Sequence, residues 1–265
     1  MSEVKSVDGD SKFPVIAQIP TFDNVEEHRK WLLQYMAAAF RVFARKGFSV
    51  GIAGHISVRD PENPNTFWLN PLGQHFSTIK ASDLVLVDEE GNIVGGSRRA
   101  VNKAGFRIHG AIHKARPDVI AACHTHSIYG KSYSAFGKPL DMINQDACIF
   151  YNNHCVYKDF GGVVLSAGEG EQIAKALGDN SAVILQNHGL LTVGTCPSAA
   201  AALFCLMEDA CHAQLLADAS RYEPKIISDA AAEFTYKATS APEILHAEFM
   251  PDYEVELKLD NSFLN

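Results

Sequence analysis

Three histidines stand where imidazoles could hold a metal ion. His124 and His126 are two residues apart and follow the apolar run 119–123, and His188 follows the apolar run 182–185. In a strand, residues i and i+2 project from the same face about 6.6 Å apart, at a rise of roughly 3.3 Å per residue. Two imidazoles from one strand and a third from a separate loop are a usual protein contribution to a catalytic metal site with open positions. We therefore expect these three histidines to bind one divalent metal ion.

The hydrophobic pattern predicts the helices and strands that would position these histidines. Apolar residues at helical spacing predict helices over residues 23–47, 103–115, 169–177 and 198–220. Short apolar runs between Pro, Asn and Gly clusters predict strands over residues 48–52, 55–59, 66–69, 84–87, 93–94, 119–123, 163–165, 182–185 and 190–193. Because the helix over 198–220 is apolar almost all round, we expect it to be buried in the interior or against another subunit.

Composition limits the class of protein. The 265 residues are 47% hydrophobic and 20% charged, as in an ordinary globular domain. The formal net charge of −8 opposes binding to nucleic acid or anionic lipid. No apolar run approaches the ~18 residues of a membrane span, and the N-terminus is acidic where a signal peptide is basic. The six cysteines include no CxxC pair, which favours buried free thiols. We expect a cytoplasmic protein that acts on a small molecule and has no nucleic-acid or membrane partner.

Several strings, in order along most of the chain, resemble the class II aldolase/adducin family. They are Gly54-His55-Ile56-Ser57-Val58-Arg59, Asn70-Pro71-Leu72-Gly73, His109 to His113 followed by Ala115-Arg116-Pro117-Asp118-Val119, His124-Thr125-His126 and Gln186-Asn187-His188-Gly189-Leu190-Leu191. The resemblance implies an α/β fold, a three-layer α/β/α sandwich around a mostly antiparallel sheet, commonly assembled as a homotetramer. It also implies that His124, His126 and His188 hold the metal, zinc first and iron or manganese as alternatives.

The resemblance runs from about Asp23 to Ser220, and we predict residues 21–221 to be the family domain. Residues 1–20 carry Ser, Asp, Gly and Lys around a short apolar patch and are predicted to be a flexible N-terminal arm. Residues 222–265 show no clear motif, and we expect a C-terminal extension packed on the domain or on a neighbouring subunit.

Two positions depart from the pattern of the sugar-phosphate members. Those enzymes carry Ser-Ser-Glu, whose acid/base glutamate lies four residues before the histidine that matches His109. This chain has Lys103-Ala104-Gly105 there, and a glycine can neither accept a proton nor bind a metal. The family's Gly-Asn is Gly54-His55 here. We therefore expect an unphosphorylated substrate, with His55 or a group from a neighbouring subunit replacing the glutamate as the catalytic group.

Other polar residues have a structural and a functional interpretation. His55 is either a core histidine bonded to a carbonyl or a group at the metal or substrate. Gly73, Asn102, Lys103 and Gln145 are candidate substrate-binding residues, although Asn102 also suits a helix cap and Lys103 would suit an anionic group. His109 and His113 lie one helical turn apart and are expected to pack or cap within the helix.

Three functions are consistent with this pattern. A divalent ion held by three neutral imidazoles keeps its full charge, which suits carbon-carbon bond cleavage by retro-aldol or decarboxylation chemistry. The first hypothesis is thus a metal-dependent lyase of the class II aldolase type acting on a small oxygenated substrate. The second is a non-haem iron oxygenase or decarboxylase on the same fold, since three ligands and open sites also suit iron. The third is a non-catalytic adducin-like binding module.

Overall fold

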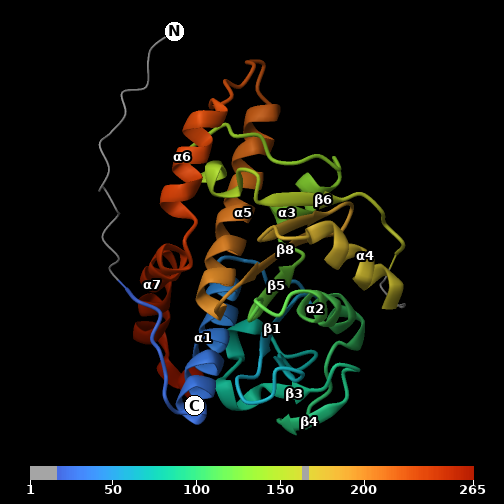
Figure 1. The fold of residues 1–265 in the computed structure, drawn as a ribbon, viewed down its shortest axis with the longest axis vertical. Coiled ribbons are helices and arrows are strands. Elements are labelled where there is room, and N and C mark those ends of the chain that lie inside the picture. The colour runs from blue at the N-terminus through green and yellow to red at the C-terminus, as the bar shows by residue number, and fades with distance from the viewer. Residues whose placement is uncertain (1–16, 163–166) are drawn as a thin grey trace.

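The computed structural model describes residues 17–162 and 167–265, and in them one eight-stranded sheet lies between two layers of helices (Figure 1). The helices are α1 (Val25–Arg45), α2 (Lys103–Ala115), α3 (Ile128–Ser134), α4 (Ala167–Leu177), α5 (Pro197–Asp218), α6 (Asp229–Thr239) and α7 (Pro242–Leu259). The strands are β1 (His55–Arg59), β2 (Phe67–Leu69), β3 (Val85–Val87), β4 (Ile93–Gly96), β5 (Ala121–Thr125), β6 (His154–Tyr157), β7 (Ala182–Leu185) and β8 (Gly189–Gly194).

The sheet places the two histidine segments side by side. Its order is β4-β3-β2-β1-β5-β8-β7-β6, and every neighbouring pair is antiparallel except β6 with β7. β5 therefore lies between β1 and β8, with His124 opposite His55 on one side and opposite Leu191 on the other. The mostly antiparallel sheet predicted from the sequence is confirmed.

A hydrophobic core covers each face of the sheet, because neighbouring residues of a strand point to opposite faces. Ala122 of β5 packs in the core under α2 and α4, and the next residue, Cys123, packs in the larger core under α1, α5 and α7. In Figure 1, α2 and α4 lie to the right of the sheet and α7 lies far to the left. The three-layer α/β/α sandwich is thus the observed fold.

The apolar helix α5 is buried by its own chain. It contacts α1, α3, α7 and β8, and Phe204 and Met207 are fully buried. By length and composition it could also cross a membrane, but 67% of its apolar window is buried inside the fold. These contacts explain why α5 is apolar almost all round, so its composition does not require a subunit interface.

The structure differs from the sequence prediction at several elements. Residues 48–52 form no strand but a turn closed by the Val50–Ala53 bridge. The first helix begins at Val25, two residues later than predicted, because the Asn24 side chain caps it by accepting hydrogen bonds from the Glu26 and Glu27 amides. The hydrophobic pattern of the sequence did not predict α3, β6, α6 or α7. The predicted strand 163–165 and residues 1–16 of the predicted arm lie outside the described residues.

The segment 222–265 packs against the rest of the chain. α7 contacts α1 and α5, and Arg45 of α1 pairs with Asp252 and Glu256 of α7 at 2.6 Å each. The division into a domain over 21–221 and an extension over 222–265 stays a prediction.

Candidate active site

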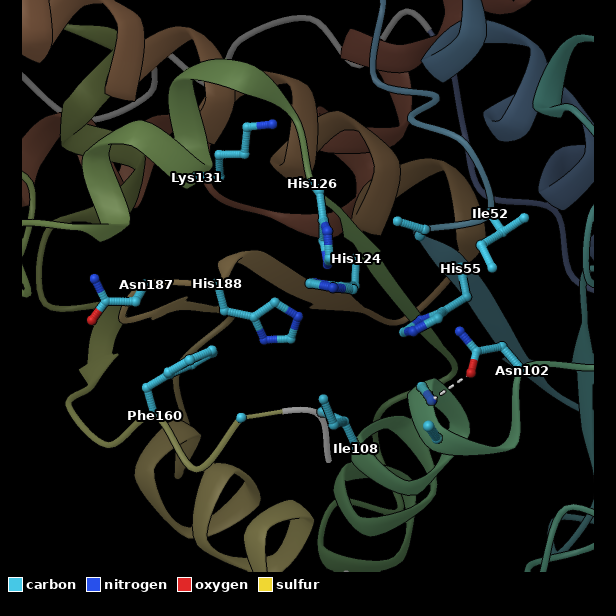
Figure 2. A pocket seen from close by; sticks show the side chains of 15 residues that line it. Ile52, His55, Asn102, Ile108, His124, His126, Lys131, Phe160, Asn187 and His188 are labelled. Atoms are coloured by element: carbon cyan, nitrogen blue, oxygen red, sulfur yellow. Dashed lines mark hydrogen bonds between the residues drawn. The ribbon is translucent and has the colours of Figure 1, made fainter. Parts of the chain in front are cut away.

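Three imidazoles converge at the end of β5. His124 lies in β5, His126 follows that strand, and His188 precedes β8. One ring nitrogen of each lies within 4.8 Å of one nitrogen of the other two, and Figure 2 shows the three rings facing a common space. Three imidazoles with further positions left for water or substrate match the donor set of catalytic zinc and non-haem iron sites. The residues predicted as metal ligands are therefore brought together, and their chemistry fits a divalent ion.

A close approach between β5 and the start of β8 brings His188 to this position. A Cβ atom on Gly189 would lie 2.9 Å from the carbonyl oxygen of Thr125, so a side chain there would push the strands apart. The backbone turns sharply two residues earlier, at Asn187, whose φ of 59° is left-handed. Asparagine adopts that conformation more readily than most residues do.

Hydrogen bonding and burial prepare these histidines for metal binding. The Nδ1 atom of His124 donates to the Leu190 carbonyl at 2.7 Å, which leaves its Nε2 lone pair free. Burial, followed by the nearby His188, holds the pKa of His124 well below its usual range. Burial and the neighbouring His126 lower the pKa of His188 to about 4. Both rings are therefore neutral at pH 7, as a ligating imidazole must be.

A buried carboxylate fixes the segment that follows His126. Glu208 of α5 accepts hydrogen bonds from the Ser127 hydroxyl at 2.5 Å and from the amides of Tyr129 and Gly130 at 2.8 and 2.7 Å. These donors belong to the first turn of α3, where amides lack partners inside the helix. Glu208 thereby ties the loop after β5 to the buried helix α5.

The imidazole of His55 fills the space next to Gly105. A Cβ atom on Gly105 would lie 1.9 Å from Nε2 of His55, a distance at which two atoms overlap. The His55 ring centroid is 5.1 Å from that of His124. The two departures from the sugar-phosphate pattern therefore share one volume, since the histidine at position 55 excludes a side chain at position 105.

These rings border a pocket of about 480 Å³. It is lined by Ile52, Ala53, Gly54, His55, Asn102, Ala104, Gly105, Ile108, His124, His126, Lys131, Phe160, Gly162, Asn187 and His188. Lys131 comes from α3, and the apolar side chains of Ile52, Ile108 and Phe160 lie on separate sides of the pocket (Figure 2). The described lining contains no carboxylate, and the acid/base side chains among its residues are the histidines and the lysine.

Of the four residues predicted to bind substrate, one lines the pocket and three do not. Asn102 lines the pocket and also caps α2, since its side chain accepts a hydrogen bond from the Gly105 amide at 3.0 Å. Gly73 and Gln145 are exposed and lie outside the pocket lining. The Lys103 amine bonds the Asn92 side chain at 3.3 Å and is likewise not in the lining. Substrate binding by these four residues stays a prediction.

Several residues that line or support the site could not be identified from the sequence. Lys131 and Phe160 were not predicted, because α3 is short and the segment before α4 has no periodic pattern. His109 and His113 are fully buried and bond to Ser57 of β1 at 2.7 Å each. Their spacing of one helical turn was the available signal, and it indicated only that they share one face of α2.

Comparison with known proteins agrees with this geometry. The family model described as the class II aldolase and adducin N-terminal domain matches residues 34–215. The chain belongs to this family. A solved structure titled L-fuculose 1-phosphate aldolase from Glaciozyma antarctica PI12 superposes with a TM-score of 0.85 at 45% identity, covering 91% of this chain and 94% of that one.

Two relatives in the class II aldolase and adducin family carry functional names. Decarboxylase NovR of Streptomyces niveus is 44% identical over 263 residues, which cover 98% of this chain and 96% of that protein. The 4-hydroxy-3-prenylphenylpyruvate oxygenase/4-hydroxy-3-prenylbenzoate synthase of Streptomyces roseochromogenus subsp. oscitans is 48% identical over 202 residues, covering 76% and 73%. The family thus includes proteins named for aldol cleavage, decarboxylation and oxygenation.

Proposed function

We propose that this protein is a metal-dependent lyase that breaks a carbon-carbon bond in a small, unphosphorylated, oxygenated acid. The observation that carries the proposal is the pocket itself, where three converging imidazoles lie beside His55 in the volume next to Gly105. Retro-aldol cleavage and decarboxylation share one requirement, which is stabilisation of the electron pair that the breaking bond leaves behind.

In this proposal His124, His126 and His188 hold the metal ion, with zinc as the first choice and iron or manganese as alternatives. The bound ion supplies Lewis-acid stabilisation of negative charge on a substrate oxygen. The neutral state and the Nδ1–H···O=C bond of His124 are the chain's own contribution, because they direct a free lone pair at the site.

His55 is the proposed acid/base group. In a retro-aldol reaction its Nε2 accepts the proton of the substrate hydroxyl, that oxygen forms a carbonyl, and the bonding electron pair stays on the other fragment. The same nitrogen then returns the proton to that fragment. In a decarboxylation, Nε2 of His55 accepts the proton of the substrate carboxyl group, carbon dioxide leaves, and the same nitrogen returns that proton to the carbon left behind. A positioned group of this kind contributes about 10²–10⁴-fold to the rate.

The pocket favours a carboxylate with an apolar or aromatic portion. Lys131 is the one Lys or Arg side chain of the described lining, and a single ammonium suits a carboxylate. Ile52, Ile108 and Phe160 offer an apolar surface for the rest of the molecule. The decarboxylase name of NovR, 44% identical, also supports a substrate that carries a carboxylate.

A second function has support from a named relative. The oxygenase of Streptomyces roseochromogenus subsp. oscitans is 48% identical, and three imidazole ligands also suit ferrous iron. The binding-module hypothesis gives no chemical reason for three imidazoles that converge on a pocket, which favours an enzyme. From the family resemblance we further propose a cytoplasmic homotetramer.

The proposal is tested by purifying the protein without added metal, measuring its metal content and assaying a set of acids. The set includes aromatic and aliphatic 2-hydroxy and 2-oxo acids, with sugar phosphates as the comparison group. We expect bound divalent metal and release of carbon dioxide or an aldehyde from unphosphorylated acids, abolished by a chelator. Turnover confined to sugar phosphates would overturn the substrate class, and cleavage unaffected by removal of metal would overturn the mechanism.

A further inference from the structure

A continuous line of hydrogen bonds runs from the pocket into the core between β1 and α2. His55 Nδ1 lies 2.9 Å from His109 Nε2, and His109 Nδ1 lies 2.7 Å from the Ser57 hydroxyl. The same hydroxyl lies 2.7 Å from His113 Nε2, and His113 Nδ1 lies 3.2 Å from the carbonyl oxygen of Val119. We call these four side chains, with the Val119 carbonyl, the histidine chain.

The Val119 carbonyl, at the end of the histidine chain, fixes which atom donates and which accepts in every bond. A carbonyl oxygen only accepts, so Nδ1 of His113 carries the hydrogen and its Nε2 is a lone pair. The single hydroxyl hydrogen of Ser57 must then point at His113, and the Ser57 oxygen accepts from Nδ1–H of His109. His109 therefore has its lone pair on Nε2.

The first link follows from the same rule. Because His109 accepts through Nε2, Nδ1 of His55 is the donor. A neutral imidazole has one N–H, so Nε2 of His55 carries the lone pair. This is the nitrogen that lies 1.9 Å from the position a Cβ of Gly105 would take, at the pocket wall.

The surroundings keep these rings neutral. The four side chains are between 0% and 6% exposed, and no carboxylate is among their described partners. The guanidinium of Arg59 donates to the His113 carbonyl at 2.6 Å and disfavours a second positive charge there. Burial first, and Arg59 second, lower the pKa of His113 to about 3.

We infer that the histidine chain holds His55 in the Nδ1–H tautomer and so presents a lone pair on Nε2 to the pocket. His109, Ser57 and His113 are then positioning residues for His55. The inference rests on the proposed function only for the use made of that lone pair. In the opposite tautomer Nε2 would present a hydrogen to the pocket and could not accept a proton.

The histidine chain ends at a backbone carbonyl instead of solvent, so its geometry fits orientation better than proton conduction. A carbonyl oxygen has no proton to give, and Val119 is itself buried. A proton taken up by Nε2 of His55 must therefore return to the pocket. This matches a reaction in which one group first accepts a proton and then delivers it to the other fragment.

The test is the nitrogen NMR spectrum of metal-free protein labelled with ¹⁵N-histidine, recorded in the solid state so that assembly size does not matter. Signals are assigned by replacing one histidine at a time. We expect a protonated Nδ1 and an unprotonated Nε2 for His55, His109 and His113. A protonated Nε2 on neutral His55 would overturn the inference.

Substitutions of Ser57, in the middle of the histidine chain, test whether the chain positions His55. Ser57→Ala removes the acceptor for His109 and the donor for His113, so we expect a new Nε2–H signal from His55 that Ser57→Thr suppresses. The matched control is Ser198→Ala, which removes a buried serine-histidine bond of the same 2.7 Å, to His246 and outside the pocket. His55 signals unchanged by Ser57→Ala would contradict positioning. If Ser57→Ala does not fold, the wild-type spectrum alone decides the tautomer.

These measurements use no substrate and no metal. A wrong tautomer overturns the inference whatever reaction the protein catalyses. The expected tautomer in a protein without lyase activity would overturn only the proposed function.

Discussion

The backbone of Gly105 and the imidazole of His55 lie so close that no side chain fits between them. An added Cβ would be 1.9 Å from Nε2 of His55, and 2.3 Å from its Cδ2. A side chain at position 105 therefore requires a smaller or displaced residue at position 55.

Gly105→Ala is expected to displace His55 and to lower kcat by about 100-fold or more, the lower range of a positioned acid/base group. Alanine is otherwise the better helix former, by up to about 1 kcal/mol, so the helix itself tolerates it. The measurement is kcat together with the urea unfolding midpoint. Gly110→Ala is the control in the same helix, because its Cβ would meet Phe106 at an ordinary 3.4 Å. Equal activity of the two variants would refute the role of His55.

His188→Ala is expected to weaken zinc binding by at least about 100-fold, since loss of even an indirect partner of a metal ligand costs 10–100-fold. Competition against a coloured chelator measures the affinity. His75→Ala changes an exposed histidine outside the pocket and should leave zinc binding unchanged. Full zinc affinity in His188→Ala would remove this residue from the metal site.

Lys131→Met is expected to raise KM for a carboxylate substrate by about 10- to 100-fold, the equivalent of 1.5–3 kcal/mol for a hydrogen bond to a charged group. For a retro-aldol substrate the kcat should change little, because the lysine binds the carboxylate and not the carbon-carbon bond that breaks. Lys138→Met is the comparison, since Lys138 pairs with Asp218 at 2.9 Å and lies outside the pocket lining. A fall in kcat at constant KM would instead place Lys131 in the chemical step.

The stability of the metal-free protein should fall as the pH falls below about 6.5. His113 and His188 have folded-state pKa values of about 3 and about 4, below the ordinary 6.5, so the unfolded chain binds more protons between these values. Each such group therefore stabilises the fold fully above pH 6.5 and costs about 1 kcal/mol between pH 6.5 and 5.5. Urea unfolding across this range measures the slope. A free energy of unfolding that is flat from pH 7.5 to 5.5 would contradict burial of these rings.

Local patterns predicted the parts of the fold and the site that depend on neighbouring residues. The apolar run of β5 and the spacing of His124 and His126 are local, and they led to the correct strand and the correct cluster. The α6 and α7 segments carry no regular apolar stripe. The position of α6 is set by packing on the turn Asp146–Phe150, and that of α7 by packing on α1 and α5. No sequence pattern shows such packing.

The contacts that connect separate elements needed the structure. The departures at positions 55 and 105 are both visible in the sequence, but only the packing of β1 against α2 shows that they occupy one volume. His109 was expected to pack within its helix, and it instead bonds to His55 and Ser57, more than fifty residues away. The residue types identified the candidate site residues. Their hydrogen-bond partners could be identified only from the tertiary structure.

The most direct test of the proposed lyase is turnover by protein loaded with zinc alone and assayed without oxygen. Zinc has no redox chemistry, so it can support cleavage by charge stabilisation but cannot activate oxygen. We predict that the zinc form splits its acid substrate at the same rate with and without oxygen, and that His55→Ala loses most of that rate. Turnover only with iron and oxygen, with one oxygen consumed per substrate, would contradict this prediction.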